Sequence, residues 1–466
     1  MKLTIHGAAR QVTGSMHLLE VNGYKILVDC GLDYDRERRL EDNANFPFDP
    51  ASIDVVVLTH AHIDHSGNIP TLIRMGFEGQ IICTAPTAEL SELLLMDSVN
   101  IFLRKQEKAR KYSRKKHSRG GGPQPLYLQK HVMDMMERIV SVGFNRPFRL
   151  NGDVELRFIP VGHLLGAAAV HFTLQEHGET KTIAFTGDVG RYNYPVLQDP
   201  EVIPPADYLV SESTYGGRFH KTDKTIDETL IETIQKTCID ERGRLIIPAF
   251  SIGRTQALVF SLNKIFSRGL LPPVKVFVDS PLAMMATEVF RRHHNLLNED
   301  AQSFYRQSGD EFEFDNLTYV EKLSDSRQIS NYFEPCVIVS SAGMLEGGRI
   351  QDHLFYNISN YYCTILFIGY SAKGTLGNRL LRGDPIVKIR DRELSVYATI
   401  RQTDLFSGHA DHKGLMETVK QQDAAKLKKV FLVHGEPESM TALADNLQAE
   451  GYQVEMPEAG IGYELE

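Results

Sequence analysis

Short apolar runs of strand length alternate with segments of helical apolar spacing along this chain of 466 residues. Several early runs read as strands: residues 3–6, 18–21, 24–28 and 55–58. Asn22-Gly23 separates the second run from the third, and this dipeptide between apolar runs is a strong hairpin signal. Helical spacing is found at residues 70–75, 87–103 and 129–141. The pattern predicts an α/β fold.

Six predicted strands end in a polar side chain of the kind that binds metals. These side chains are Asp29, His60, His163, Asp188, Glu212 and His434. One strand end of this kind is common in proteins, whereas six are not. We expect these residues to share one rim of the fold.

The densest group of such side chains lies in residues 59–67, which read Thr-His-Ala-His-Ile-Asp-His-Ser-Gly. In an extended segment, side chains two residues apart point the same way, so His60 and His62 can bind one ion. Asp64 and His65 are adjacent and can face a second ion. Imidazole nitrogen and carboxylate oxygen are ligands that zinc and similar metals take. The alternative is a polar surface loop, which is hard to reconcile with four such groups in six residues.

Strands and helices also alternate in the middle of the chain. The predicted helices are residues 225–237 and 256–266, and the predicted strands are 245–248, 275–278, 337–340 and 364–368. Alternation of this kind implies βαβ units on a parallel sheet.

Composition excludes several classes of protein. With 42% hydrophobic and 24% charged residues, the chain resembles an ordinary soluble protein. No apolar run approaches the roughly 18 residues that span a bilayer, and the N-terminus shows no signal-peptide pattern. The five cysteines are scattered and form no C-x-x-C pair, which indicates a reducing compartment. We therefore expect a cytoplasmic protein that does not engage a membrane.

The net charge of −9 hides one basic segment, residues 104–119. It holds nine Lys and Arg residues and one acid, Glu107, so its local charge is 9 − 1 = +8. A basic segment on an acidic body predicts contact with a polyanion. A solvated loop is the alternative.

The polar residues together resemble a known family. The set Asp29, His60, His62, Asp64, His65, His163 and Asp188 is similar to the metal site of the metallo-β-lactamase superfamily. Glu212 in Ser-Glu-Ser-Thr, His409 in Ser-Gly-His-Ala-Asp and His434 in Val-His-Gly-Glu resemble motifs A, B and C of its β-CASP branch of nucleic-acid-processing nucleases. Further segments resemble the branch of this family that contains the cleavage-and-polyadenylation endonuclease and its bacterial relatives. These segments are residues 5–15, 247–256, 279–282, 341–349 and 369–377.

The resemblance implies an architecture. It is a metallo-β-lactamase αββα sandwich with an inserted β-CASP α/β domain, whose parallel sheet is flanked by helices. The expected boundaries are 1–215 for the N-terminal part of the sandwich, 216–399 for the inserted domain and 400–466 for the C-terminal part.

The resemblance also implies roles for the polar residues. His60, His62 and His163 would hold one metal ion, Asp64, His65 and His434 a second, and Asp188 would bridge them. Two Zn²⁺ ions are expected, with Mn²⁺ as the alternative.

Four residues are expected to take part in catalysis. His409 would be the general acid, and Glu212 would orient it. Asp64 would act as a metal ligand within the reaction centre, and Asp29 would support a ligand histidine.

Arg254, Ser341, Gly343, Arg349 and Lys373 lie in Gly-rich or basic stretches that can contact phosphates. A simple turn is the alternative for residues 340–349.

The function implied is a two-metal ribonuclease that cuts single-stranded RNA endonucleolytically, leaving a 5′-phosphate and a 3′-hydroxyl. Alternatives are a 5′-to-3′ exoribonuclease, a DNA nuclease of the same family, a small-molecule metallo-hydrolase and an inactive RNA-binding subunit. His434 favours RNA, since the related DNA nucleases typically carry valine there. A homodimer is left open.

Overall fold

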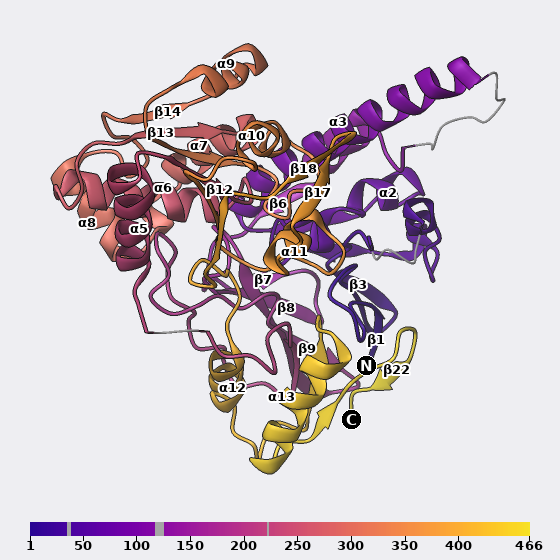
Figure 1. Ribbon diagram of the computed structural model, residues 1–466. Coiled ribbons are helices and arrows are strands. Elements are labelled where there is room, and N and C mark those ends of the chain that lie inside the picture. Colours follow the sequence, from indigo (N-terminus) through magenta and orange to yellow (C-terminus); the bar gives the residue numbers. More distant parts are fainter. Residues whose placement is uncertain (35–38, 117–124, 221–222) are drawn as a thin grey trace. The chain divides into compact units, whose positions relative to one another are not determined.

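The computed structural model describes residues 1–34, 39–116, 125–220 and 223–466, without the side chains of residues 108–116. The chain forms two units (Figure 1). The first unit comprises Met1–Tyr192, Asp199–Phe219 and His409–Glu466, and the second comprises Asn193–Gln198 and His220–Gly408. The predicted domain boundaries lie after residues 215 and 399, whereas the units change at 219/220 and 408/409.

The first unit contains two seven-stranded sheets. The strands of one sheet are, in spatial order, β22 (Gly462–Glu464), β1 (Lys2–Gly7), β2 (Met16–Val21), β3 (Tyr24–Val28), β4 (Val55–Val57), β5 (Gln80–Cys83) and β6 (Ile139–Ser141). Those of the other are β21 (Val454–Glu455), β20 (Lys429–Val433), β11 (Tyr208–Glu212), β10 (Glu179–Phe185), β9 (Ala168–Glu176), β8 (Val154–Pro160) and β7 (Phe148–Arg149). Both chain ends lie at one edge, because β22 pairs with β1 (Figure 1).

Alternating apolar residues of the two sheets form a shared core. Val55 and Val57 of β4 belong to the same buried cluster as Phe172 of β9 and Phe431 of β20. The intervening residue Val56 belongs to a second cluster, on the opposite face of its sheet, as expected from the two-residue period of a strand. The helices of this unit are α1 (Ile63–Ser66), α2 (Ile69–Arg74), α3 (Ala85–Lys116), α4 (Gln129–Glu137), α12 (His412–Lys420) and α13 (Pro437–Ala449).

These layers confirm the αββα sandwich. Residues of α2, α3 and α4 pack in the second cluster against the first sheet. Helices α12 and α13 contact β11 and β20 of the other sheet. Each sheet is therefore covered by helices on its outer face and by the other sheet on its inner face.

The second unit is built on a six-stranded sheet whose neighbouring strands are all parallel. Its strands are, in spatial order, β14 (Leu317–Tyr319), β13 (Lys275–Asp279), β15 (Cys336–Ser340), β12 (Arg244–Pro248), β16 (Cys363–Phe367) and β19 (Thr399–Gln402). The helices are α5 (Ile226–Ile234), α6 (Arg254–Ser267), α7 (Pro281–Arg292), α8 (Glu299–Ser308), α9 (Leu323–Gln328), α10 (Ile350–Asn357) and α11 (Leu376–Leu381). A hairpin of β17 (Ile386–Ile389) and β18 (Arg392–Ser395) completes it. The predicted parallel sheet is confirmed.

One predicted helix is shorter than its apolar spacing suggests. Helix α4 ends at Glu137, and residues 139–141 form strand β6, which pairs in parallel with β5. Ile139 and Val140 are β-branched and extend the edge of the sheet. These residues therefore form a strand, although their apolar spacing also fits a helix. This part of the interpretation was wrong.

The predicted basic segment continues a long helix. Helix α3 runs to Lys116, whereas residues 117–119 and the side chains from residue 108 to 116 lie outside the described part of the chain. No helix among the described residues is both long and apolar enough to cross a membrane.

Candidate metal centre

The six predicted strand ends meet at one edge of the first unit. Strands β10, β11 and β20 are mutually parallel neighbours, and β3 and β4 form a parallel pair in the facing sheet. Parallel strands present their carboxyl ends on the same side, so the loops that follow them converge. This convergence brings together side chains that are far apart in the sequence.

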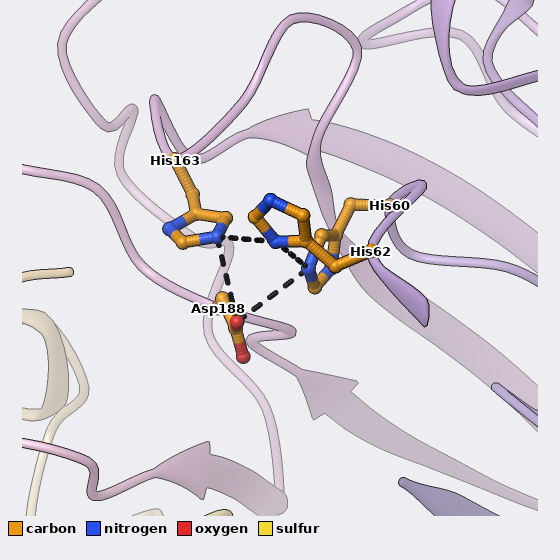
Figure 2. Close-up of side chains that lie close together, drawn as sticks. All are labelled: His60, His62, His163 and Asp188. Carbon is orange, nitrogen blue, oxygen red and sulfur yellow. Dashed lines mark hydrogen bonds and ion pairs between the residues drawn. The ribbon is translucent and has the colours of Figure 1, made fainter. Parts of the chain in front are cut away.

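One group consists of His60, His62, His163 and Asp188, whose nearest ligand atoms all lie within 4.8 Å of one another (Figure 2). His62 Nδ1 lies 3.1 Å from both His60 Nε2 and His163 Nε2. Asp188 Oδ2 lies 3.5 Å from the same two Nε2 atoms. Three imidazole nitrogens and one carboxylate oxygen therefore surround one point, as a tetrahedral metal ion requires.

A second group consists of Asp64, His65 and His434, again within 4.8 Å. His434 Nε2 lies 3.5 Å from Asp64 Oδ2 and 3.7 Å from Asp188 Oδ1. His65 Nε2 lies 3.3 Å from the same Asp188 oxygen. Asp188 therefore turns Oδ2 to the first group and Oδ1 to the second.

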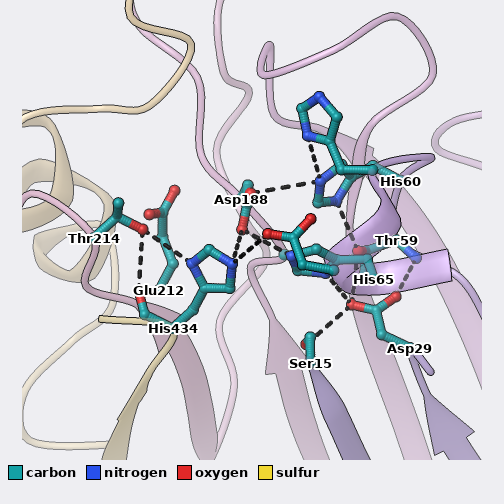
Figure 3. Close-up of polar contacts among 12 residues, drawn as sticks. Ser15, Asp29, Thr59, His60, His65, Asp188, Glu212, Thr214 and His434 are labelled. Atoms are coloured by element: carbon teal, nitrogen blue, oxygen red, sulfur yellow. Dashed lines mark hydrogen bonds and ion pairs between the residues drawn. The ribbon is translucent and has the colours of Figure 1, made fainter. Parts of the chain in front are cut away.

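Neighbouring side chains fix the orientation of the histidine rings (Figure 3). His65 Nδ1 lies 2.7 Å from Asp29 Oδ2. Because a carboxylate only accepts hydrogen bonds, the Nδ1–H of His65 donates to Asp29, and its Nε2 faces Asp188. Asp29 also accepts from Thr59, from its backbone N–H at 2.8 Å and from its hydroxyl at 2.9 Å. On the other side, Thr214 Oγ1 lies 3.0 Å from His434 Nδ1, which leaves His434 Nε2 directed to the site.

Two of these residues adopt a backbone conformation that L-amino acids seldom occupy. Asp29 has a φ of 59° and His434 has a φ of 52°. Hydrogen bonds hold both positions: the Asp29 N–H donates to Val57 O at 2.9 Å, and the His434 N–H donates to Ala8 O at 2.7 Å. Non-glycine residues with such φ values cluster at functional sites.

Burial and charge act in opposite directions on the ring pKa values. Burial lowers the pKa of His60, and it lowers the pKa of His62 to about 4, so both rings are neutral at pH 7. Burial also lowers the pKa values of His65 and His434, but the neighbouring carboxylates together outweigh it and raise both: Asp188 with Asp29 at His65, and Asp188 with Asp64 at His434. Burial raises the pKa of Asp188, and the neighbouring histidines, His434 first, outweigh it and hold that pKa well below its usual range.

The residues fit a divalent cation. His65 Nε2, His434 Nε2 and Asp188 Oδ1 are buried and have no hydrogen-bond partner among the described residues. Buried polar atoms without hydrogen bonds are rare, and three that face one another form an arrangement that suits a divalent cation. A metal ion would satisfy these atoms and take the place of the protons on His65 and His434.

Glu212 and His409 lie beside this cluster. His409 Nδ1 is 3.2 Å from Glu212 Oε2 and 3.9 Å from Asp188 Oδ2. Glu212 is buried and also accepts a hydrogen bond from the Val189 N–H. The His409 ring is partly exposed, so its outer edge can meet a substrate while its Nδ1 stays paired with the carboxylate.

Three family models match the chain. Residues 9–225 match the model described as "Metallo-beta-lactamase superfamily", and residues 255–380 match the "Beta-Casp domain". Residues 393–457 match the "Zn-dependent metallo-hydrolase RNA specificity domain".

The chain is also 31% identical over 462 residues to "Ribonuclease TTHA0252" of Thermus thermophilus, an alignment that covers 99% of each protein. The chain belongs to the β-CASP family of the metallo-β-lactamase superfamily. This β-CASP protein is accordingly a hydrolase, and its His/Asp cluster binds a divalent metal.

Two further relatives are longer than the chain. It is 28% identical over 459 residues to "Transcription termination factor FttA" of Methanosarcina mazei, covering 96% of this β-CASP chain and 69% of that protein. It is 28% identical over 454 residues to "Endoribonuclease YSH1" of Candida glabrata, covering 95% and 55%. A solved "Protein of Unknown Function from Enterococcus faecalis V583" shares the fold, with a TM-score of 0.57, 13% identity and 99% coverage of both chains.

Three residues that contact the site residues of this β-CASP protein were not predicted from the sequence. Thr59 binds both Asp29 and His60, with 3.2 Å between Thr59 Oγ1 and His60 Nδ1. Thr214 binds His434, and the Ser15 hydroxyl lies 3.5 Å from Asp29 Oδ2. Two of them could have been found from their position in the sequence, since Thr59 directly precedes the histidine motif and Thr214 ends Ser-Glu-Ser-Thr.

The residues predicted to bind substrate all belong to the second unit and follow the carboxyl ends of parallel strands; Arg254 begins helix α6, and the others lie on loops. Arg254 follows β12 and its guanidinium lies 4.6 Å from the centroid of the Phe250 ring. Ser341 follows β15, and its hydroxyl donates to Ser280 Oγ at 3.2 Å. Lys373 is exposed on the loop after β16. Their part in substrate binding stays a prediction.

The other two predicted substrate-binding residues lie on the loop after β15. A side chain at Gly343 would meet the Phe250 ring at 3.5 Å. Arg349 is held within the unit, because its guanidinium donates to Asp279 Oδ1 at 2.7 Å and to Val320 O at 2.9 Å. Arg349 therefore secures the Gly-rich loop, and its contact with substrate also stays a prediction.

Proposed function

We propose that this protein is a two-zinc ribonuclease that cuts single-stranded RNA endonucleolytically and leaves 5′-phosphate and 3′-hydroxyl ends. The observation that carries the proposal is the position of Asp188, whose two oxygens face two separate histidine groups. Two-metal sites of phosphodiester-cleaving enzymes need such a shared anionic ligand. The ribonuclease names of similar proteins support RNA as the substrate.

The proposed ligands divide between the two oxygens of Asp188. His60, His62 and His163 with Oδ2 would hold one zinc ion, and Asp64, His65 and His434 with Oδ1 would hold the other. Nitrogen-rich ligand sets favour zinc over manganese in intrinsic affinity. When bound, divalent ions here would supply Lewis acidity, which lowers the pKa of water and offsets phosphate charge.

The chain's own residues would supply the proton for the leaving group. With Nδ1–H donating to Glu212, the Glu212 carboxylate stabilises the imidazolium form of His409. The other nitrogen, Nε2, would then hold the proton that passes to the departing 3′-oxygen of the ribose. Glu212 is a positioning residue in this scheme, as is Asp29 through His65.

Several observations favour RNA over DNA. The match of residues 393–457 to an "RNA specificity domain" covers the segment that carries His409 and His434. His434 occupies the position where, on the family resemblance, DNA nucleases carry valine. Single-stranded RNA is the substrate form that the proposal names, and Arg254 and Lys373 of the second unit offer side chains for contacts with its phosphates.

The alternatives are tested by one experiment. A 5′-to-3′ exoribonuclease would release mononucleotides from 5′-labelled RNA, a DNA nuclease would cut matched DNA, and a small-molecule hydrolase would cut neither. Purified protein with its metal quantified is incubated with end-labelled single-stranded RNA and the matched DNA. The proposal expects about two zinc equivalents and a ladder of internal RNA cuts.

The general acid is tested in the same assay with His409→Asn. The asparagine amide can keep the hydrogen bond to Glu212, whereas the transferable proton is lost. We expect kcat to fall by about 10²–10⁴-fold with the metal content retained. The matched control is His177→Asn at an exposed turn with a φ of 53°, a conformation that asparagine tolerates. Full activity in His409→Asn would exclude this role.

A further inference from the structure

An exposed aromatic surface lies at the amino ends of the central strands of the second unit, opposite the edge that carries Arg254 and Ser341. We define it by Phe333, Tyr356 and Tyr362 together with Arg242 and Glu334, which all line one pocket of about 500 Å³. The side chains of Phe333, Tyr356 and Tyr362 are 93%, 61% and 63% exposed. Single exposed aromatics are common, but three around one pocket mark a surface that another molecule covers.

The pocket has a rigid floor. The Arg244 guanidinium donates to Asn357 Oδ1 at 3.2 Å and also to Tyr332 O. A side chain at Gly243 would come within 1.6 Å of Tyr362 O, so the two backbone segments touch. Strands β12, β15 and β16 begin here, and register pairs Arg244 with the first residues of β15 and β16. A fixed floor means that a partner meets a preformed pocket.

The charges around the pocket argue against a nucleic acid as the occupant. Arg242 and Arg244 are balanced by Glu241 and Glu334, so the lining carries no excess positive charge. Nucleic-acid binding depends on such an excess, because phosphates dominate the affinity. Helix α10 also ends at this pocket, and the carboxyl end of a helix repels anions.

The surface is complementary to itself. Phe333 projects from the rim into solvent, and the pocket beside it, at about 500 Å³, has room for an aromatic ring of another molecule. Arg242 and Glu334 offer opposite charges on the same rim. A two-fold axis through this surface would bring each feature to its counterpart on a second copy, which is the condition for an isologous dimer.

We propose that the aromatic surface is the interface of a homodimer. Phe333 of one copy fills the pocket of the other, and Arg242 pairs with Glu334 of the partner subunit. Aromatic side chains in preformed pockets are the usual energetic centre of an interface.

The first test measures the mass of the full-length protein in solution across a wide concentration range. The wild type is expected to dimerise, and Phe333→Asp is expected to raise the dimer dissociation constant by about 30-fold or more. Val202→Asp is the control, since Val202 is 67% exposed and lies in the first unit, outside the aromatic surface. Unfolding temperature and RNA cleavage report whether each variant is folded.

The second test exchanges charges across the interface. Arg242→Glu and Glu334→Arg are each expected to weaken the dimer, because like charges then face each other in both symmetry-related pairs. Mixing the two variants is expected to restore a dimer that contains one copy of each.

Two outcomes would overturn the proposal. One is a wild type that stays monomeric at every concentration. The other is a dimer whose dissociation constant is the same in Phe333→Asp as in the wild type, since the two copies would then meet at a different surface. A monomeric wild type whose RNA affinity falls in Phe333→Asp would instead assign the surface to RNA.

Discussion

Asp29 shows how a side chain that need not touch a metal can govern a metal site. Its carboxylate receives hydrogen bonds from the Thr59 backbone and hydroxyl at 2.8 and 2.9 Å and from His65 Nδ1 at 2.7 Å. The carboxylate is buried, so these bonds are poorly screened and hold the His65 ring in one orientation.

Replacing Asp29 by alanine should therefore weaken metal binding more than it weakens the fold. We expect Asp29→Ala to lower metal affinity by about 10–100-fold, measured by competition with a chromophoric chelator. Asp445→Ala, at an exposed position on α13, is the matched control. Equal metal affinity in Asp29→Ala and the wild type would contradict the role of Asp29.

His17 is a buried imidazole beside the metal centre. Its Nε2 lies 3.2 Å from Ser15 Oγ, and its ring stacks on Phe185 with 6.0 Å between centroids. Burial, followed by the positive charges of His65 and His434, lowers the pKa of His17 to about 3. His17 therefore stays neutral in the folded protein.

This lowered pKa predicts a pH dependence of stability. In the unfolded chain the pKa of His17 is about 6.5, so the unfolded state takes up the proton first as the pH falls. The stabilisation is complete above pH ~6.5 and declines toward pH ~3, by at most about 1.4 kcal/mol per pH unit. The free energy of unfolding of the metal-free protein should depend less steeply on pH in His17→Gln, as measured by urea denaturation. If the free energy of unfolding depends equally steeply on pH in His17→Gln and in the wild type, the lowered pKa of His17 does not cause the pH dependence.

At the scale of elements, the loop after β3 and the short helix α1 form one unit of the site. The Cys30 N–H donates to His65 O at 2.8 Å, and the Leu32 N–H donates to Ile63 O at 2.9 Å. Gly31 lies between them, and a Cβ there would be 1.6 Å from Asp64 O. The two segments can approach so closely only because residue 31 has no side chain.

Gly31→Ala should consequently push α1 out of place and move both Asp64 and His65. We expect a loss of stability of about 1–3 kcal/mol from overpacking, together with weaker metal binding. In Gly152→Ala the new Cβ meets nothing within 4 Å, so this control should keep the metal affinity of the wild type. Calorimetry and metal titration measure the two effects. A Gly31→Ala protein with unchanged metal affinity would show that α1 tolerates displacement.

At the scale of the whole molecule, the metal centre joins both sheets of the first unit. His60 follows β4 of one sheet, whereas His163, Asp188 and His434 follow β8, β10 and β20 of the other. Bound metal therefore cross-links the two layers, while every described residue of the cluster belongs to this unit.

Metal removal should accordingly destabilise the first unit selectively. At a free metal concentration of about 1,000 times Kd, binding contributes about 4 kcal/mol to the folded state. After chelation, hydrogen exchange should accelerate in β4, α1 and β20 and stay unchanged in β12 and β15 of the second unit. Restoring zinc should reverse the change. Equal acceleration in both units would indicate that the metal stabilises the protein as one cooperative body.

Sequence patterns were sufficient to predict most of the strands, the parallel sheet and the polar strand ends that meet at the metal centre. These features depend on local patterns: the two-residue period of β4, the spacing of His60, His62 and Asp64, and the turn chemistry of Asn22-Gly23. The αββα sandwich followed from the resemblance that these residues carry. Local patterns were misleading at residues 139–141, where pairing with β5 replaced the expected helix.

The way in which those residues act together depends on the packing of segments that are remote in the sequence. That Asp188 turns one oxygen to His60 and the other to His65 depends on the packing of two sheets, whose strands come from distant parts of the chain. The partnership of Thr214 with His434 and the burial of His17 arise in the same way. Sequence spacing fixes the direction of neighbouring side chains, whereas distances between remote segments are set by the close packing of the core.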